Sequence, residues 1–186
     1  KMDLSMTSYN IEMTEITGGT FWRAFTPEQV AGKEEIKASG LEEKEKMMQV
    51  FPPIDLKETR IRTLGKALGP VWVRVSGTWA TSTYYDFDGH TDGETPKGFK
   101  SVLTKKQWDN VLDYVKEIGG KLLVSVANCS GVHNEDGTLN LDQARILFEY
   151  SKEYGVPINA AEFMNEPNLL AMSGAPEGYT LEEFCR

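Results

Sequence analysis

The chain of 186 residues is poor in the residues that build disulfide frameworks and zinc sites, because it has only two cysteines and two histidines. Cys129 and Cys185 are single cysteines far apart in the sequence, which excludes a disulfide scaffold and a paired-cysteine zinc pattern. Cys129 follows an apolar run and is predicted to be a buried, inert thiol. His90 lies in an acidic loop whose spacing does not match the EF-hand pattern. The sequence therefore predicts no metal site and no cofactor.

A long apolar run and an excess of positive charge are also lacking. No hydrophobic stretch reaches the roughly 20 residues that cross a bilayer, so no transmembrane segment is predicted. The first residues, Lys1-Met2-Asp3-Leu4, do not form a signal peptide. With 20 basic and 28 acidic residues the net charge is −8, which argues against a nucleic-acid-binding protein. The hydrophobic content of 40% and the charged content of 26% are typical of a globular domain with a hydrophobic core.

Strand-like and helix-like segments alternate along the chain. Four segments rich in apolar and β-branched residues are predicted to be strands, at 8–13, 71–75, 122–126 and 158–163. Capping patterns predict helices that begin near Asp55, Thr104 and Asn140. The side chains predicted to face the core are Ile61, Leu64 and Leu68 in the first helix, Trp108, Val111, Leu112 and Val115 in the second, and Ala144, Leu147, Phe148 and Ser151 in the third. This order predicts an α/β fold with a parallel sheet.

Two architectures fit this order. A doubly wound nucleotide-binding sheet needs a glycine-rich turn after its first strand, and Thr17-Gly18-Gly19-Thr20 lacks the required spacing. A (β/α)8 TIM barrel is favoured, because polar residues stand at the carboxyl ends of the strands, where barrel enzymes place catalytic groups. Such a barrel takes about 250 residues, so we expect this chain to hold about the first four βα units. Residues 1–186 are then the N-terminal half of a catalytic domain, and the rest of the barrel lies outside this chain.

Asn165-Glu166-Pro167 is the segment with the clearest chemical meaning. It follows the fourth predicted strand, so Glu166 is placed where a carboxyl group can exchange a proton with a substrate. The amide of Asn165 can hydrogen-bond a substrate hydroxyl. Pro167 disfavours a helical conformation for the residue before it. The segment predicts that Glu166 is an acid/base residue.

Several segments together resemble glycoside hydrolase family 79, the heparanase and β-glucuronidase family. Tyr9-Asn10-Ile11-Glu12 is similar to the end of the first strand of that family, with Glu where heparanase has Asp. Arg62-Thr63-Leu64 and Val73-Arg74-Val75-Ser76-Gly77-Thr78 are similar to the next helix and strand, except that a serine replaces a glycine. Asn128 matches the asparagine that ends the third strand. Met164-Asn165-Glu166-Pro167-Asn168 matches the fourth, except that methionine replaces a glycine.

The resemblance implies a role for each matched residue. Glu166 is the general acid/base, and Asn165 holds the sugar 2-hydroxyl, where hydrogen bonds tighten in the transition state. Glu12 accepts hydrogen bonds from the hydroxyls of the reacting sugar. The other substrate-binding residues are Gly77 and Thr78, which shape the floor of the site, and Asn128, which orients Glu166 or touches the sugar. The nucleophile is expected to be a glutamate downstream of this chain.

Some neighbouring residues have two open interpretations. Arg74 alternates with two valines, so it is either a structural ion inside the sheet or a substrate contact. Glu162 lies within its strand and either points into the interior of the fold or forms a structural pair. The rings of Trp79, Tyr84 and Tyr85 either stack on sugars or pack their own loop.

The sequence therefore predicts a retaining glycoside hydrolase that acts on β-glucuronides or on polysaccharides containing glucuronate. The alternatives are another retaining β-glycosidase of the same clan, acting on a hexoside or xyloside, and a non-catalytic carbohydrate-binding protein. A carbohydrate is the expected partner, together with the C-terminal half of the enzyme, and nucleic acid is not expected. By the resemblance, the protein is expected to be secreted, periplasmic or lysosomal.

Overall fold

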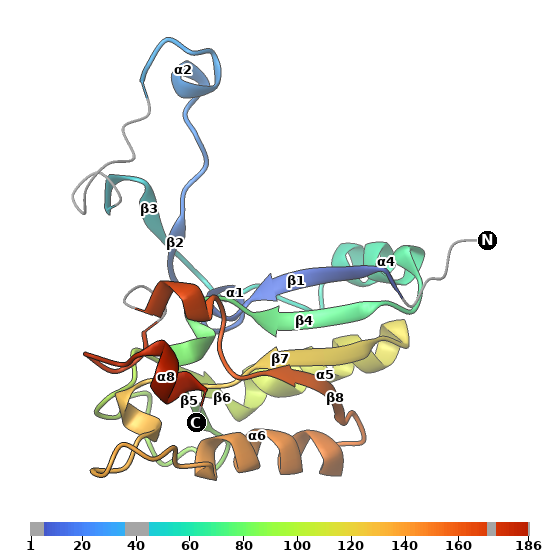
Figure 1. The fold of residues 1–186 in the computed structure, drawn as a ribbon. Coiled ribbons are helices and arrows are strands. Elements are labelled where there is room, and N and C mark those ends of the chain that lie inside the picture. The colour runs from blue at the N-terminus through green and yellow to red at the C-terminus, as the bar shows by residue number, and fades with distance from the viewer. Residues whose placement is uncertain (1–5, 36–44, 171–173, 186) are drawn as a thin grey trace.

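The computed structural model describes residues 6–35, 45–170 and 174–185, which form an α/β fold around a four-stranded parallel sheet (Figure 1). The strands of this sheet, in spatial order, are β1 (Ser8–Glu12), β4 (Trp72–Ser76), β7 (Lys121–Ser125) and β8 (Ile158–Glu162). Each neighbouring pair is parallel. The α/β class and the four predicted strands are therefore confirmed.

The prediction of a (β/α)8 barrel is wrong. In the described part of the chain the central sheet is open, with β1 at one edge and β8 at the other, and two separate two-stranded sheets accompany it. The physical reason for the error is that alternation of strands and helices is common to open parallel sheets and closed barrels. Alternation indicates which strands are parallel, and it does not determine whether the first and last strands meet.

The two faces of the central sheet have different environments. Val73, Val75, Leu122 and Val124 are completely buried on one face, where they share a core with the helix α5 (Lys105–Ile118). Successive side chains along a strand point to opposite faces, and the side chain of Arg74 accordingly lies on the other face and is partly exposed. The helical side is thus the apolar core, and the opposite side carries polar residues.

Helix α5 agrees closely with its sequence pattern. Thr104 caps its N-terminus, and its hydroxyl accepts a hydrogen bond from the backbone N–H of Gln107, as in a capping box. Gly119 ends the helix in a left-handed conformation. The four predicted core residues of this helix are all buried, and the indole Nε1 of Trp108 donates to Ser151 at 2.9 Å. Ser151 belongs to α6 (Asp142–Glu153), so this bond joins the two helices.

The predicted core faces of the other two helices are partly wrong. In α4 (Thr59–Leu68), Leu64 and Leu68 are exposed, and Gly65 is the buried residue. Gly65 packs against the ring of Tyr114 in α5, and the lack of a side chain allows this close approach. In α6, Leu147 and Ser151 are buried as predicted, whereas Phe148 is 37% exposed.

An arm extends from the sheet (Figure 1). It contains the antiparallel strands β2 (Gly19–Trp22) and β3 (Met48–Phe51) and the short helix α2 (Pro27–Val30). The short helix α1 (Met13–Thr17) connects it to β1. The arm rises from the end of the sheet where the strands have their carboxyl ends (Figure 1).

Further short elements accompany the central sheet. A second small sheet pairs β5 (Thr83–Asp86) with β6 (Ser101–Thr104) in parallel. A 3-10 turn, Pro167–Leu169, follows the motif around Glu166, and α8 (Leu181–Phe184) begins with a capping box at Thr180, as its sequence predicts. Among the helices in the described ranges, none combines the length and the apolarity that crossing a membrane requires.

Candidate functional site

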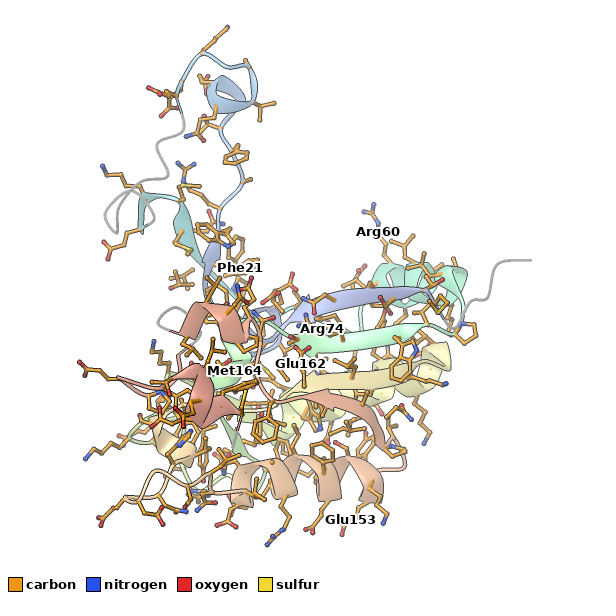
Figure 2. The ribbon with its side chains drawn as sticks, viewed as in Figure 1. Phe21, Arg60, Arg74, Glu153, Glu162 and Met164 are labelled. Atoms are coloured by element: carbon orange, nitrogen blue, oxygen red, sulfur yellow. The ribbon has the colours of Figure 1, made fainter. Side chains whose placement is uncertain are left out.

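The predicted site residues other than Asn128 lie at or just beyond the carboxyl ends of the central strands. Because the four strands are parallel, these ends form one edge of the sheet, which we call the carboxyl rim. In open α/β sheets, ligands bind in the crevice outside this edge. Arg74 and Glu162 lie on the sheet face opposite helix α5 (Figure 2).

Glu12 is the last residue of β1, and its carboxylate is half-buried. Its Oε1 accepts a hydrogen bond from Asn10 Nδ2 at 2.8 Å, and its backbone N–H donates to Glu15. Burial raises the pKa of Glu12, and the negative charges of Glu15 and Glu166 add to this effect. The hydrogen bond from Asn10 and the charge of Arg74 oppose it.

Gly77 makes room for the Glu12 carboxylate. It follows β4 with a φ of 95°, which is a conformation that favours glycine. A methyl group built on Gly77 would lie 2.9 Å from Oε1 of Glu12 and closer still to Oε2. Thr78 follows in the same turn and is half-buried. Gly77 therefore lies directly beside the Glu12 carboxylate, and Thr78 is the next residue along the chain.

Glu166 is exposed and has an unusual backbone conformation. Its φ of 49° and ψ of 61° lie in the left-handed region, where a residue with a side chain is strained by roughly 1–2 kcal/mol. Pro167 disfavours the right-handed helical alternative. Strain of this kind is concentrated at functional sites. Glu166 Oε2 accepts a hydrogen bond from Asn165 Nδ2 at 3.3 Å.

Arg74 connects the two halves of the rim. Its Nη1 donates to Asn10 Oδ1 at 2.8 Å, and its Nη2 donates to Asn165 Oδ1 at 2.9 Å. The same Nη2 forms an ion pair with Glu162, toward which the side chain points (Figure 2). Of the two interpretations of Arg74, the structure supports a paired ion within the sheet.

Glu162 is held by three neighbouring side chains. Its Oε1 accepts from Arg74, from Ser76 Oγ at 2.7 Å and from Ser125 Oγ. Burial alone would raise the pKa of Glu162, but the hydrogen bonds from Ser125, Ser76 and Arg74 outweigh it and lower the pKa. Glu162 is therefore an ionised partner that fixes Arg74.

Asn128 lies behind the rim rather than on it. Its side chain is completely buried, and its Oδ1 lies 2.7 Å from His133 Nε2. Its Nδ2 donates to the sulfur of Met164 at 3.4 Å. Direct contact between Asn128 and a sugar is incompatible with this burial. Its position instead supports the segment that leads to Asn165.

The aromatic residues near the rim differ in exposure. Tyr85 is 1% exposed and belongs to the core, so stacking on a sugar is excluded for it. Tyr84 is half-buried against Phe99. Trp79 packs edge-on against Phe21 of the arm, with 5.2 Å between the ring centres. Trp79 is half-buried, so part of its ring remains accessible.

One group of side chains in the described residues has a metal-like arrangement. Ligand atoms of Asp86, Asp88 and His90 all lie within 4.8 Å of one another. However, both oxygens of Asp86 already accept hydrogen bonds from the loop itself, including 2.6 Å from the Thr91 hydroxyl. This pattern is that of a loop stabilised by its own buried aspartate.

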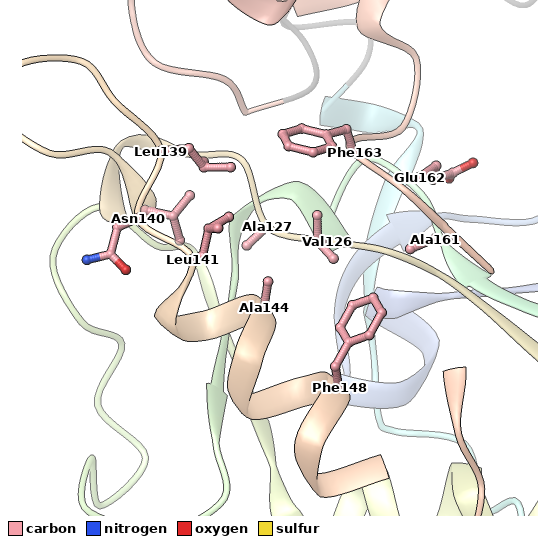
Figure 3. A pocket seen from close by; sticks show the side chains of 11 residues that line it. Val126, Ala127, Leu139, Asn140, Leu141, Ala144, Phe148, Ala161, Glu162 and Phe163 are labelled. Carbon is pink, nitrogen blue, oxygen red and sulfur yellow. The ribbon is translucent and has the colours of Figure 1, made fainter. Parts of the chain in front are cut away.

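An apolar cavity of about 170 Å³ lies between α6 and the end of β8 (Figure 3). Its walls include Leu141, Phe148 and Phe163. Glu162 also borders this cavity, but its carboxylate points away from the centre (Figure 3). The cavity therefore contributes no acid/base group.

The structure thus brings Glu12, Gly77, Thr78, Asn165 and Glu166 to one rim, and it places Asn128 behind it. Sequence reasoning missed Asn10, Ser76 and Ser125 as parts of the polar network. The available signal was the alternation of side-chain directions along each strand. This alternation places the three residues on the same sheet face as Glu12, Arg74 and Glu162. In comparisons with known proteins, no family model matches the chain, and no curated protein matches it.

Proposed function

We propose that this protein is a retaining β-glycoside hydrolase in which Glu166 is the general acid/base. The observation that carries the proposal is the pairing of Asn165 and Glu166 at the carboxyl rim, in one hydrogen-bond network with Arg74, Asn10 and Glu12. A carboxyl group that can donate a proton is one of the two groups that glycosidic bond cleavage uses, and the amide of Asn165 and the carboxylate of Glu12 can hydrogen-bond sugar hydroxyls.

In the proposed mechanism, Glu166 first donates a proton to the oxygen of the leaving group. The nucleophile attacks the anomeric carbon and forms a glycosyl–enzyme intermediate. Glu166 then removes a proton from the water that hydrolyses this intermediate. Retaining enzymes hold the two reacting carboxyl groups about 5–5.5 Å apart. By the resemblance the nucleophile is a further glutamate, and none of the carboxylates described above is assigned that role.

The neighbouring residues have binding roles in this proposal. One hydrogen of Asn165 Nδ2 is directed to Glu166, and the second meets the sugar 2-hydroxyl. Glu12 accepts hydrogen bonds from other hydroxyls of the same sugar, and the half-buried face of Trp79 is available for stacking. A secreted, periplasmic or lysosomal protein acting on polysaccharides fits these roles.

The first candidate substrate is a β-glucuronide, on the basis of the motifs shared with family 79. A second candidate, a neutral β-hexoside or β-xyloside, is favoured by the charge of the rim. Glu12, Glu162 and Glu166 are acidic, and Arg74 is already paired with Glu162. A uronate carboxylate would therefore need a positive charge from outside the rim.

The test is hydrolysis of a panel of aryl β-glycosides by the full-length protein and by its Glu166→Gln variant. General acid catalysis contributes about 10²–10⁴-fold, so the variant should lose that factor on substrates with poor leaving groups. Activated aryl substrates, which need less protonation, should be affected less in the glycosylation step. Unchanged rates on poor leaving groups would remove Glu166 from the mechanism. Sugar binding without hydrolysis of any substrate in the panel would favour the carbohydrate-binding alternative.

A further inference from the structure

We infer that Arg74 is a positioning residue that orients one side-chain amide toward each of the two rim carboxylates, Glu12 and Glu166. The inference rests on the proposed function for its catalytic consequence. Its structural part depends only on the hydrogen bonds of the described residues.

The first step concerns the direction of the two amides. A guanidinium group only donates hydrogen bonds, so an asparagine facing Arg74 must present its oxygen to it. Asn10 and Asn165 both do so, at 2.8 and 2.9 Å. The amide nitrogen of each asparagine is then directed away from Arg74.

The second step concerns what these nitrogens meet. Asn10 Nδ2 donates to Glu12 Oε1 at 2.8 Å, and Asn165 Nδ2 donates to Glu166 Oε2 at 3.3 Å. One guanidinium therefore determines that both carboxylates receive an N–H donor. With either amide rotated by 180°, its oxygen would face a carboxylate, and two acceptors would be in contact.

The third step concerns what holds Arg74. Glu162 pairs with its Nη2 and also lies 3.4 Å from its Nε. Ser76 and Ser125 are completely buried and bind the same Glu162 oxygen. Because these partners come from β4, β7 and β8, the position of Arg74 is set by the sheet itself. A planar fork of donors can satisfy these partners together, whereas a lysine ammonium has neither the planar shape nor the reach.

The experiment compares Arg74→Lys and Glu162→Gln with a matched control, Arg62→Lys. Arg62 also pairs with a glutamate, Glu117, but this pair joins α4 to α5 on the helical side. Loss of an oriented hydrogen bond to a charged group corresponds to about 10–100-fold in an equilibrium or rate constant. We expect kcat/KM on aryl β-glycosides to fall by about this factor in Arg74→Lys and Glu162→Gln, mainly through kcat. The control should retain the wild-type kcat.

A second measurement tests the orientation without any activity. In NMR spectra of the full-length protein, the side-chain amide signals of Asn10 and Asn165 should move as the adjacent carboxylates titrate. In Arg74→Lys these pH-dependent shifts should be lost, while the side-chain amide signals of other residues should keep their wild-type positions. If the wild type hydrolyses no glycoside but the amide shifts behave as expected, the proposed function fails and the positioning stands. If the shifts or the kcat of Arg74→Lys equal those of the wild type, the positioning inference is overturned.

Discussion

The replacement of Gly77 by alanine tests the geometry of the rim most directly. Gly77 has a φ of 95°, and an added methyl group would overlap the Glu12 carboxylate. Gly89 is a matched control, because it also has a positive φ, of 77°, but nothing lies within 4 Å of the corresponding methyl position. Both variants therefore carry backbone strain, and only Gly77→Ala also displaces Glu12.

The expected magnitudes follow from these contacts. A left-handed conformation costs a residue with a side chain about 1–2 kcal/mol, so Gly89→Ala should be destabilised by about that amount. Displacement of Glu12 also breaks its 2.8 Å hydrogen bond from Asn10. A hydrogen bond to a charged group contributes about 1.5–3 kcal/mol, and the lower end applies because Glu12 is only half-buried. Gly77→Ala should therefore lose about 2.5–3.5 kcal/mol.

The assay is a urea titration of both variants at pH 7, combined with kcat/KM on an aryl β-glycoside. Since about 1.4 kcal/mol corresponds to a tenfold change, the loss of one oriented contact in Gly77→Ala should lower kcat/KM about tenfold or more. Gly89→Ala should retain the wild-type kcat/KM. Equal destabilisation and equal activity of the two variants would refute the conclusion that Gly77 is required by the Glu12 carboxylate.

Three further predictions concern the core and the pH dependence of stability. Gly65→Ala should be destabilised by about 1–3 kcal/mol through overpacking, because the added methyl group would lie 3.0 Å from Cζ of Tyr114. Replacing glycine by alanine within a helix usually stabilises a protein, so a higher denaturation midpoint in this variant would contradict the prediction. Ser151→Ala should cost about 1–3 kcal/mol by leaving the buried Trp108 indole N–H without an acceptor, measured by urea titration, and an unchanged midpoint would oppose it. Burial raises the pKa of Glu12 above 4.5. The contribution of this carboxyl group to the unfolding free energy is therefore fully present below pH 4.5, and it is lost as the pH rises through the pKa of the folded state. In Glu12→Gln the unfolding free energy should therefore decrease less than in the wild type as the pH rises just above 4.5. The same pH dependence in both proteins would exclude the raised pKa.

The parts of the fold that could be predicted from sequence are those where several local signals agree. In α5 the capping residues Thr104 and Gln107, the spacing of apolar residues and the final Gly119 all indicate the same helix. The strands β2, β3, β5 and β6 have four residues each, which is the shortest length at which a period of two indicates a strand. The core face of α4 was mispredicted because its buried residue is Gly65, which lies against Tyr114, and glycine carries no hydrophobic signal.

The candidate site was only partly predictable, because its network depends on the register between strands. The sequence indicates that Glu12 and Glu166 each follow a strand, and the parallel order then brings both to one rim. It does not indicate that Asn10 lies beside Arg74, or that Ser125 lies beside Glu162, since these pairs are set by the pairing of β1 with β4 and of β7 with β8. A shift of one residue in either register would turn one member of each pair toward the helical core. A shift between β1 and β4 would separate Asn10 from Arg74, so Glu12 would lose its fixed amide donor. A shift between β7 and β8 would separate Ser125 from Glu162, so the ion pair of Arg74 would lose one of its supports. The burial of the valines on the opposite face of the sheet opposes such a shift, so the packing of the core also maintains the polar network of the site.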